Sequence, residues 1–273
     1  MRTSAGLSYS RIEITKDSRT KRLGCVHESR DEVLASHCNP PRAVYSYRKS
    51  MGGLEDTSST TNQQIASSNP SDDFCIIWTL KIIDYILGKA RYRTVPIEIG
   101  SKYTDDNWTQ SLMTVGDFVE KYIKNKLDQK EIGYLAQHNL FNQIPELFED
   151  IEVPSYITNK DDVDVSVWFG PGGTVSPLHF DPKYNLLAQV IGEKYIRLYS
   201  EDQTENLYPR HNTWLSNTSQ VDAENPDLDS FPLFAEATYE ECVLKPGQLL
   251  FIPPRCWHYV RSLSTSFSVS FWW

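Results

Sequence analysis

His179, Asp181 and His258 are the residues whose types and spacing point to metal chemistry. The first two lie in TVSPLHFDP at residues 174–182, and the third lies in LLFIPPRCWHYV at residues 249–260. Residues two apart on a strand point to the same face, so we expect His179 and Asp181 to bind one ion from one strand, with His258 on a later strand. Two imidazoles and one carboxylate leave half of the coordination sphere open, which is typical of non-haem Fe(II) and O2 chemistry.

The His-x-Asp pair alone is weak evidence. A chain with six histidines contains such a pair by chance in about one of every two or three cases, and the alternative is a surface His beside a turn Asp. The surroundings favour the metal site. A Ser and a Pro precede the pair, strand patterns lie on both sides, a lysine opens the next strand, and the strand of His258 follows a Pro-Gly turn.

Composition limits the class of protein. The 273 residues allow one large domain or a domain with an extension, and 40% hydrophobic and 12% aromatic residues are ample for a core. A net charge of −9 argues against direct nucleic-acid binding, because no basic stripe is available to neutralise phosphates. The five cysteines form no CxxC pair, which favours a reducing compartment, and Cys256 is expected to be a core residue.

The first residues predict where the protein resides. Residues 1–30 are polar and charged, so we expect no secretory signal, and the basic cluster at residues 19–22 is a candidate nuclear signal. The longest apolar run, residues 75–87, is too short for a bilayer and includes Lys81 and Asp84. We therefore expect no membrane association, and a location in the nucleus, the cytoplasm or both.

The pattern along the chain predicts an extension and one domain. Residues 1–73 are rich in Ser, Thr, Asn and Arg, so we expect a largely disordered extension. Residues 74–273 form the domain, with a helix-rich lead-in at 74–153 and a jelly-roll core at 154–273. Helices are expected at 75–89, 115–126 and 141–148, and strands at 92–99, 132–138, 163–169, 185–190, 194–199, 242–244, 248–252, 257–261 and 266–273, with an irregular stretch at 200–239. Many short strands separated by turns predict a mostly β fold, a double-stranded β-helix of the cupin type with flanking helices.

The last strand predicts how the barrel is lined. Phe267, Val269, Phe271 and Trp273 share one face, while Ser266, Ser268, Ser270 and Trp272 share the other. Small serines beside one Trp leave room for a pocket inside a barrel, and the aromatic face is expected to pack outward on a second layer.

Several motifs resemble the JmjC family of Fe(II)- and 2-oxoglutarate-dependent oxygenases. They are RTVPIEIG at 93–100, GYLAQH at 133–138, GPGGTVSPLH at 170–179, GEKYIRLYS at 192–200, NTSQVD at 217–222 and FSVSFWW at 267–273. The resemblance runs from about residue 76 to residue 273. Residues 1–73 show neither the helical N-terminal domain nor the first strand usual in the family, so a truncated or alternatively spliced form is expected.

The resemblance assigns residues to roles. It makes His179, Asp181 and His258 the iron ligands, and it places 2-oxoglutarate against Tyr134, Gln137, Ser176, Asn185, Lys194 and Trp272. A dicarboxylate cosubstrate needs a buried cation, which Lys194 supplies, and hydroxyl and amide donors complete the contacts. The alternatives are a surface lysine in a hairpin for Lys194, and plain core packing for Tyr134 and Trp272.

The resemblance also implies an activity. O2 and 2-oxoglutarate are consumed, succinate and CO2 are released, and a C–H bond of a protein substrate is oxidised. Arginine hydroxylation is the favoured reaction, with Glu98, Tyr103 and Trp168 receiving the guanidinium. On the sequence alone, a Glu that faces a helix and two aromatic residues in the core is an equal alternative for these three residues. Demethylation of histone methyl-lysine is the alternative reaction with the same chemistry. A non-catalytic binding protein and a metal-dependent peptidase are further alternatives. The first is disfavoured because every site position is present, and the second because the metal strand lacks a neighbouring general base.

Overall fold

The computed structural model describes residues 20–22, 44–46, 81–124, 131–157, 159–211 and 214–273. Most of the expected extension, residues 1–73, lies outside these ranges. Within it, the structure describes two strands that the composition did not predict. β1 (Thr20–Arg22) pairs in parallel with β10 (Tyr239–Leu244), and β2 (Val44–Ser46) pairs antiparallel with β11 (Gln248–Ile252).

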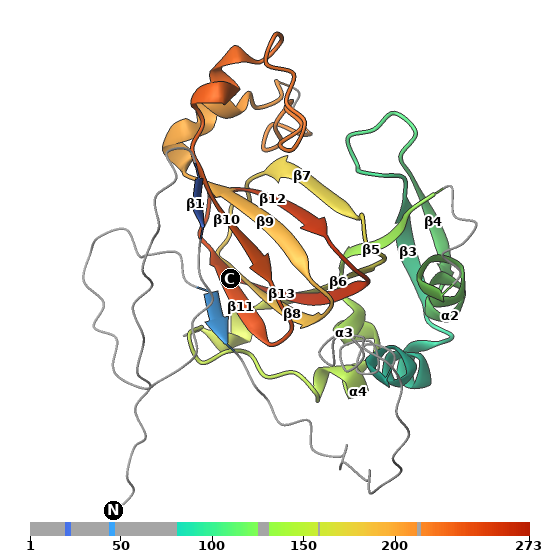
Figure 1. Cartoon of the computed structure of the whole chain (residues 1–273). Coiled ribbons are helices and arrows are strands. Elements are labelled where there is room, and N and C mark those ends of the chain that lie inside the picture. Colours follow the sequence, from blue (N-terminus) through green and yellow to red (C-terminus); the bar gives the residue numbers. More distant parts are fainter. Residues whose placement is uncertain (1–19, 23–43, 47–80, 125–130, 158, 212–213) are drawn as a thin grey trace, which may run out of the picture.

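The core consists of two β-sheets, as Figure 1 shows. The five-stranded sheet has the order β1-β10-β9-β12-β7, where β9 is Lys194–Tyr199, β12 is Trp257–Ser262 and β7 is Val175–His179. The other sheet has eight strands in the order β2-β11-β8-β13-β6-β5-β3-β4. Its remaining members are β8 (Asn185–Ile191), β13 (Ser266–Trp272), β6 (Asp164–Gly170), β5 (Gly133–His138), β3 (Thr94–Ile99) and β4 (Thr109–Thr114). This arrangement confirms the predicted mostly β, cupin-type fold.

Alternation along β12 sets up two apolar layers, one on each side of the five-stranded sheet. Trp257 and Tyr259 pack on the outer side with Leu178 and Tyr199, whereas Val260 packs inside the barrel. The inner cluster comprises Leu187, Ile196, Leu198, Cys242, Leu244, Leu250, Ile252, Cys256 and Val260. Cys256 is therefore a core residue, as predicted.

The outer side of the five-stranded sheet is covered by the segment between β9 and β10. This segment holds two 3-10 helices, η3 (Glu201–Leu207) and η4 (Pro232–Glu236), in the stretch that was predicted to be irregular. Leu207 and Phe234 bury their side chains there. The segment returns to the barrel near the strand of His179, where its residues contribute to the site described below.

Helices cover the outer face of the eight-stranded sheet. They are residues 81–90, α2 (Val115–Phe118) with the π-helix η1 (Val119–Lys124), α3 (Leu140–Gln143) and α4 (Pro145–Phe148). Thr114 begins α2 by accepting a hydrogen bond from the backbone N–H of Asp117 at 3.0 Å. The part of the predicted helix before residue 81 lies outside the described residues. Strand β4, which the sequence did not predict, has an exposed and polar pattern because it lies at the edge of its sheet.

The faces of β13 match the prediction. Phe267, Val269 and Phe271 pack into the cluster shared with the helices, while Ser270 and Trp272 face the cavity inside the barrel. In the same register, Ser270 pairs with Ser166 of β6 and with Leu187 of β8. Strand β13 thus joins the helix layer to the cavity.

Candidate metal centre and adjoining pockets

The three predicted metal ligands lie together inside the barrel. One ligand atom from each of His179, Asp181 and His258 lies within 4.8 Å of the other two. Nε2 of His258 is 3.3 Å from Oδ2 of Asp181, and Nε2 of His179 is 3.8 Å from the same oxygen. The antiparallel register of β7 and β12 places His179 opposite His258. An open divalent metal site fits this donor set.

The backbone orients both imidazoles. Nδ1 of His179 is 2.7 Å from the carbonyl oxygen of Pro177, and Nδ1 of His258 is 2.9 Å from that of Cys256. An Nδ1–H that donates to a carbonyl leaves Nε2 unprotonated and free to bind a metal. Burial, together with neighbouring His258, lowers the pKa of His179 to about 4, so this ring is neutral at physiological pH.

Asp181 differs from the prediction in one respect. Strand β7 ends at His179, so the carboxylate lies two residues beyond the strand and not within it. Its position comes from the chain on either side. The N–H of Phe180 donates to the carbonyl of Asn217 at 3.0 Å, and the N–H of Arg255 donates to the carbonyl of Asp181 at 2.8 Å. The side chains of His179 and Asp181 still meet at one point.

A buried cation lies beside the metal ligands. Lys194 has 2% of its surface exposed, and its Nζ donates to the hydroxyl of Tyr134 at 3.1 Å. The ammonium also lies 5.8 Å from the ring centroid of Trp168. Burial lowers the pKa of Lys194 to about 7 and raises the pKa of Tyr134. The surface-lysine alternative is therefore wrong, since this lysine lies in the interior.

The cavity around Lys194 has the donors that a carboxylate requires. Its lining includes Ser176, Asn185 and Trp272 together with the three metal ligands. Among the described residues, the buried Nε1–H of Trp272 and Oδ1 of Asn185 have no hydrogen-bond partner. The ammonium of Lys194 and the free N–H of Trp272 can both donate to the far carboxylate of a dicarboxylic acid, whereas Oδ1 of Asn185 is an acceptor and does not. The donor set thus fits 2-oxoglutarate, with the metal ligands at the other end.

A second pocket adjoins the Lys194 cavity and shares His179, Asp181 and Trp168 with it. Its lining includes the three residues predicted to receive the substrate, Glu98, Tyr103 and Trp168. Burial raises the pKa of Glu98 above its ordinary value, and burial raises the pKa of Tyr103 to about 12. We call this space the outer pocket. An acid and aromatic rings beside a metal centre form a suitable receptor for a cationic side chain.

Gln137 lies in the outer pocket and is not among the residues that line the Lys194 cavity. Its backbone φ of 47° is left-handed, and the pairing of β5 with β6 shifts register between Leu135 and His138. A non-glycine residue in this conformation is strained by about 1–3 kcal/mol, and such strain clusters at functional sites. The other five residues predicted for 2-oxoglutarate line the Lys194 cavity.

Sequence reasoning did not single out two residues of the outer pocket. Thr218 lies 3.2 Å from the hydroxyl of Tyr103, and Asn217 donates from Nδ2 to the carbonyl of Phe180 at 2.8 Å. Both belong to the NTSQVD motif, which was noted only for its resemblance to the family. Their spacing carried no metal or nucleophile pattern, and only the path of the chain between β9 and β10 brings them to the site.

Comparison with known proteins identifies the class. Residues 17–273 match the cupin-like domain family, and the chain belongs to the cupin-like JmjC proteins. It is similar to "Lysine-specific demethylase 8" of Danio rerio, with 60% identity over 195 residues, 70% of this chain and 48% of that protein. It is 57% identical over 195 residues to the Xenopus tropicalis protein of the same name, a match that covers 70% of this chain and 44% of that protein. It is 48% identical over 198 residues to "Jumonji C domain-containing protein 5" of Drosophila melanogaster, a match that covers 70% of this chain and 49% of that protein.

The family also supports the predicted cofactors. JmjC demethylases are dioxygenases that use Fe(II), 2-oxoglutarate and O2, which are the predicted cofactors, and the triad supplies a site for the metal. The chain spans less than half the length of the three relatives named above. In the part of the chain that the structure describes, no helix has the length and apolar character needed to cross a bilayer.

Proposed function

We propose that this protein is an Fe(II)- and 2-oxoglutarate-dependent oxygenase that acts on a cationic side chain of a protein substrate, with demethylation of methyl-lysine as its reaction. The observation that carries the proposal is the adjacency of three features: the His179–Asp181–His258 triad, the Lys194 cavity and the outer pocket with Glu98. The names of the Danio rerio and Xenopus tropicalis relatives support lysine demethylation in particular.

In this proposal, each group of residues has a distinct task. The triad holds Fe(II), which with 2-oxoglutarate supplies O2 activation and releases succinate and CO2. Lys194 pairs with the far carboxylate of 2-oxoglutarate, and Tyr134, Ser176, Asn185 and Trp272 surround it. Because Lys194 and Trp272 are buried, the cosubstrate is held away from bulk water. Its charge interactions with the protein are stronger in this interior than they would be in water. Gln137 faces the substrate side of the metal centre.

The outer pocket orients the substrate. The carboxylate of Glu98 attracts the ammonium of methyl-lysine, while the rings of Tyr103 and Trp168 contact its methyl groups. Oε2 of Glu98 accepts a hydrogen bond from Nε1 of Trp108 at 3.3 Å, which fixes the carboxylate. Hydroxylation of an N-methyl carbon gives a carbinolamine that loses formaldehyde, so oxidation of a C–H bond is sufficient for demethylation.

Arginine hydroxylation is the second candidate, and one observation favours it. Glu98 is a half-buried carboxylate that lines the outer pocket together with His179 and Asp181, and such a group can accept two parallel hydrogen bonds from a guanidinium. The same residues and cofactors serve both reactions, and the two products have different masses.

The test uses a peptide library with a central residue that is dimethyl-lysine, lysine or arginine. The reaction contains Fe(II), 2-oxoglutarate and O2. We measure the succinate that is formed, and mass spectrometry measures the change in mass of each peptide. Loss of a methyl group from the dimethyl-lysine peptides is the expected result. Gain of one oxygen on arginine peptides alone would favour the second candidate. The absence of any peptide-dependent succinate or mass change would reject both reactions.

A further inference from the structure

Two loops form facing walls of the outer pocket. The loop between β3 and β4, residues 100–108, contributes Tyr103. The loop after η3, described over residues 208–211 and 214–225, contributes Leu215, Asn217 and Thr218. The two segments are more than a hundred residues apart in the chain, so nothing in the local sequence fixes the distance between them.

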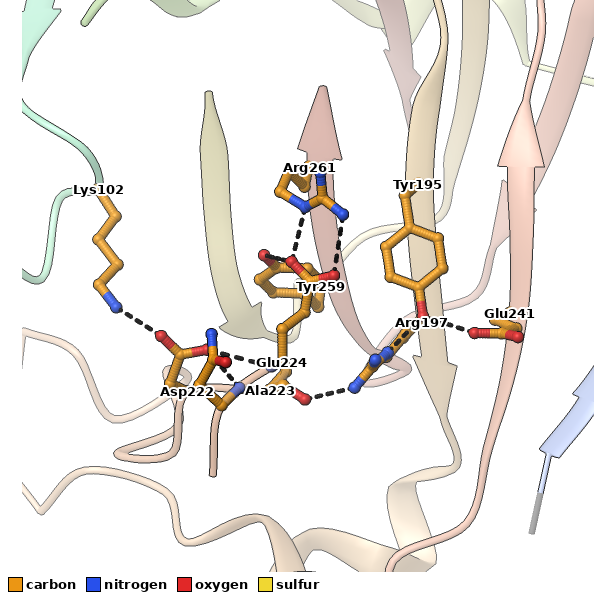
Figure 2. Close-up of polar contacts among 10 residues, drawn as sticks. Lys102, Tyr195, Arg197, Asp222, Ala223, Glu224, Glu241, Tyr259 and Arg261 are labelled. Carbon is orange, nitrogen blue, oxygen red and sulfur yellow. Dashed lines mark hydrogen bonds and ion pairs between the residues drawn. The ribbon is translucent and has the colours of Figure 1, made fainter. Parts of the chain in front are cut away.

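Two polar contacts join these walls directly. Nζ of Lys102 lies 3.1 Å from Oδ2 of Asp222, and the hydroxyl of Tyr103 lies 3.2 Å from Oγ1 of Thr218. Figure 2 shows Lys102 reaching from its loop toward Asp222. Each partner of the ion pair is thus on the same loop as a residue that lines the pocket. We call these four residues the loop clasp.

The Asp222 side of the loop clasp is fixed to the barrel. Oδ1 of Asp222 accepts from the N–H groups of Glu224 at 3.1 Å and Asn225 at 3.2 Å. Glu224 in turn accepts from Tyr259 at 2.7 Å and from Arg261 at 2.6 and 3.0 Å, both on β12 (Figure 2). This wall is therefore anchored to the strand that carries His258.

A further bond ties the same wall to β9. Arg197 donates to the carbonyl of Ala223, and its Nε donates to the hydroxyl of Tyr195 at 2.6 Å (Figure 2). The hydroxyl of Tyr195 donates to Glu241 of β10 at 2.5 Å. Strands β9 and β12 thus hold the loop that contains Asp222, and Glu241 of β10 supports Tyr195.

The Lys102 side is held at both ends of its loop. The N–H of Gly100 donates to the carbonyl of Ile132 at 3.0 Å, and Trp108 donates to Glu98 at 3.3 Å. Between these points, the side chains of Lys102 and Tyr103 contact Asp222 and Thr218 on the opposite wall. Their side chains therefore determine how far this loop stands from Thr218 and Asn217.

We propose that the Lys102–Asp222 ion pair is a positioning pair that sets the width of the outer pocket and so the affinity for the protein substrate. The inference rests on the proposed function for the identity of that substrate. The side chains of Lys102 and Asp222 are 29% and 40% exposed, so the pair adds little to global stability. Its effect is on the spacing of the walls, and it weakens at high salt.

A double-mutant cycle tests the pair. Asp222→Asn keeps an oxygen for the two N–H groups but removes the charge, and Lys102→Met keeps most of the side-chain length. Each variant should bind the dimethyl-lysine peptide about fivefold more weakly, the factor for an exposed ion pair worth about 1 kcal/mol. The double variant should lose no more than either single one. Binding of 2-oxoglutarate and the melting temperature should stay as in the parent.

Lys124→Met is the matched control. Lys124 forms an ion pair with Glu120 at 3.0 Å, with exposed fractions of 39% and 48%, on η1. This variant should leave peptide affinity unchanged. Peptide binding is measured by calorimetry with an inert divalent metal and 2-oxoglutarate present. Additive losses in the cycle, or a loss as large in Lys124→Met, would overturn the assignment.

Hydrogen exchange tests the loop clasp without a substrate, and so separates its failure from failure of the proposed function. In Asp222→Asn, amides in residues 101–108 and 214–225 should exchange faster together, while β9 and β12 keep their protection. Lys102→Met should increase amide exchange in the same two regions. Faster exchange in only one loop, or unchanged exchange in both, would show that the ion pair does not join the two walls.

Discussion

His179 and His258 face each other across the pairing of β7 with β12, with ring centroids 4.2 Å apart and planes tilted by 50°. Each ring has its Nδ1 next to a carbonyl two residues earlier in the chain, in Pro177 and Cys256 respectively. The same local arrangement on two strands points both Nε2 atoms toward Asp181. The backbone therefore prepares the ligand geometry, and the metal does not have to create it.

The first prediction concerns the metal. Asp181→Ala or His179→Ala should abolish Fe(II) binding and turnover, because each removes one of three ligands. The melting temperature without metal should change little, since both residues line a cavity and not a packed layer. Metal content by mass spectrometry and a thermal scan check this. An active Asp181→Ala protein with normal iron content would disprove the site.

The second prediction concerns Lys194. Lys194→Ala should raise the 2-oxoglutarate concentration needed for half-saturation at least about a hundredfold, because breaking a buried charge pair costs about 3–5 kcal/mol. Titration with an inert divalent metal in place of iron measures binding without turnover. Saturation at the parent concentration would mean that the ammonium does not contact the cosubstrate.

The third prediction is the dependence of that binding on pH. The pKa of Lys194 is lowered from 10.5 to about 7 by burial, so the free protein loses the proton above pH 7. A bound carboxylate favours the charged form and raises this pKa again. The affinity for 2-oxoglutarate should thus be constant below about pH 7 and fall about tenfold per pH unit above it. Lys194→Arg, which stays charged, should remove this slope.

The same shift affects stability with a definite sign. Between about pH 7 and 10.5 the unfolded chain binds more protons at Lys194 than the folded protein does. The contribution of this group to the free energy of unfolding therefore rises with pH over that window, and its full penalty is present below about pH 7. Saturating 2-oxoglutarate should reduce this dependence in urea titrations, and an unchanged slope would count against contact with Lys194.

The fourth prediction concerns Trp272. Trp272→Phe removes an N–H that has no partner among the described residues, so no internal hydrogen bond is lost. The affinity for 2-oxoglutarate should fall about three- to tenfold while the melting temperature stays nearly constant. Trp214→Phe is the control, because Trp214 is 90% exposed and does not line the cavity. If Trp272→Phe and the parent bind 2-oxoglutarate with equal affinity, the indole N–H does not contact the cosubstrate and Trp272 only packs in the cavity wall.

The fifth prediction concerns Glu98. Glu98→Gln should weaken binding of a cationic peptide about tenfold or more, since hydrogen bonds to a charged group contribute about 1.5–3 kcal/mol. Binding of 2-oxoglutarate should not change. Glu120→Gln, an exposed acid on η1, is the control. If both variants bind the peptide alike in calorimetry, Glu98 does not contact the substrate.

The sequence predicted the inner parts of the site better than the outer ones. His179, His258 and Lys194 lie on regular strands, where period-two alternation decides which side chains share a face. Asp181 was placed correctly in space although it lies just beyond β7. Strand β4 was not predicted because an edge strand with polar, exposed residues lacks the alternation of a half-buried strand.

Loops explain what the sequence could not predict. Asn217 and Thr218 reach the outer pocket only because the segment between β9 and β10 returns to β7, where the Ser219 N–H donates to the carbonyl of Leu178 at 2.8 Å. The left-handed backbone at Gln137 is likewise a consequence of the irregular pairing of β5 with β6. Neither feature has a local sequence signal, since tertiary contacts determine both.

Strand β13 makes the protein sensitive to changes of chain length at its end. All seven of its residues are buried. Ser270 and Trp272 line the Lys194 cavity, whereas Phe267, Val269 and Phe271 pack into the helix layer. One inserted or deleted residue in this strand would exchange the two sets, turning serine hydroxyls toward aliphatic neighbours and phenylalanine rings into the cavity. A substitution within β13 therefore changes either the cavity or the helix layer. An insertion or deletion of one residue would instead impair both folding and the binding of 2-oxoglutarate.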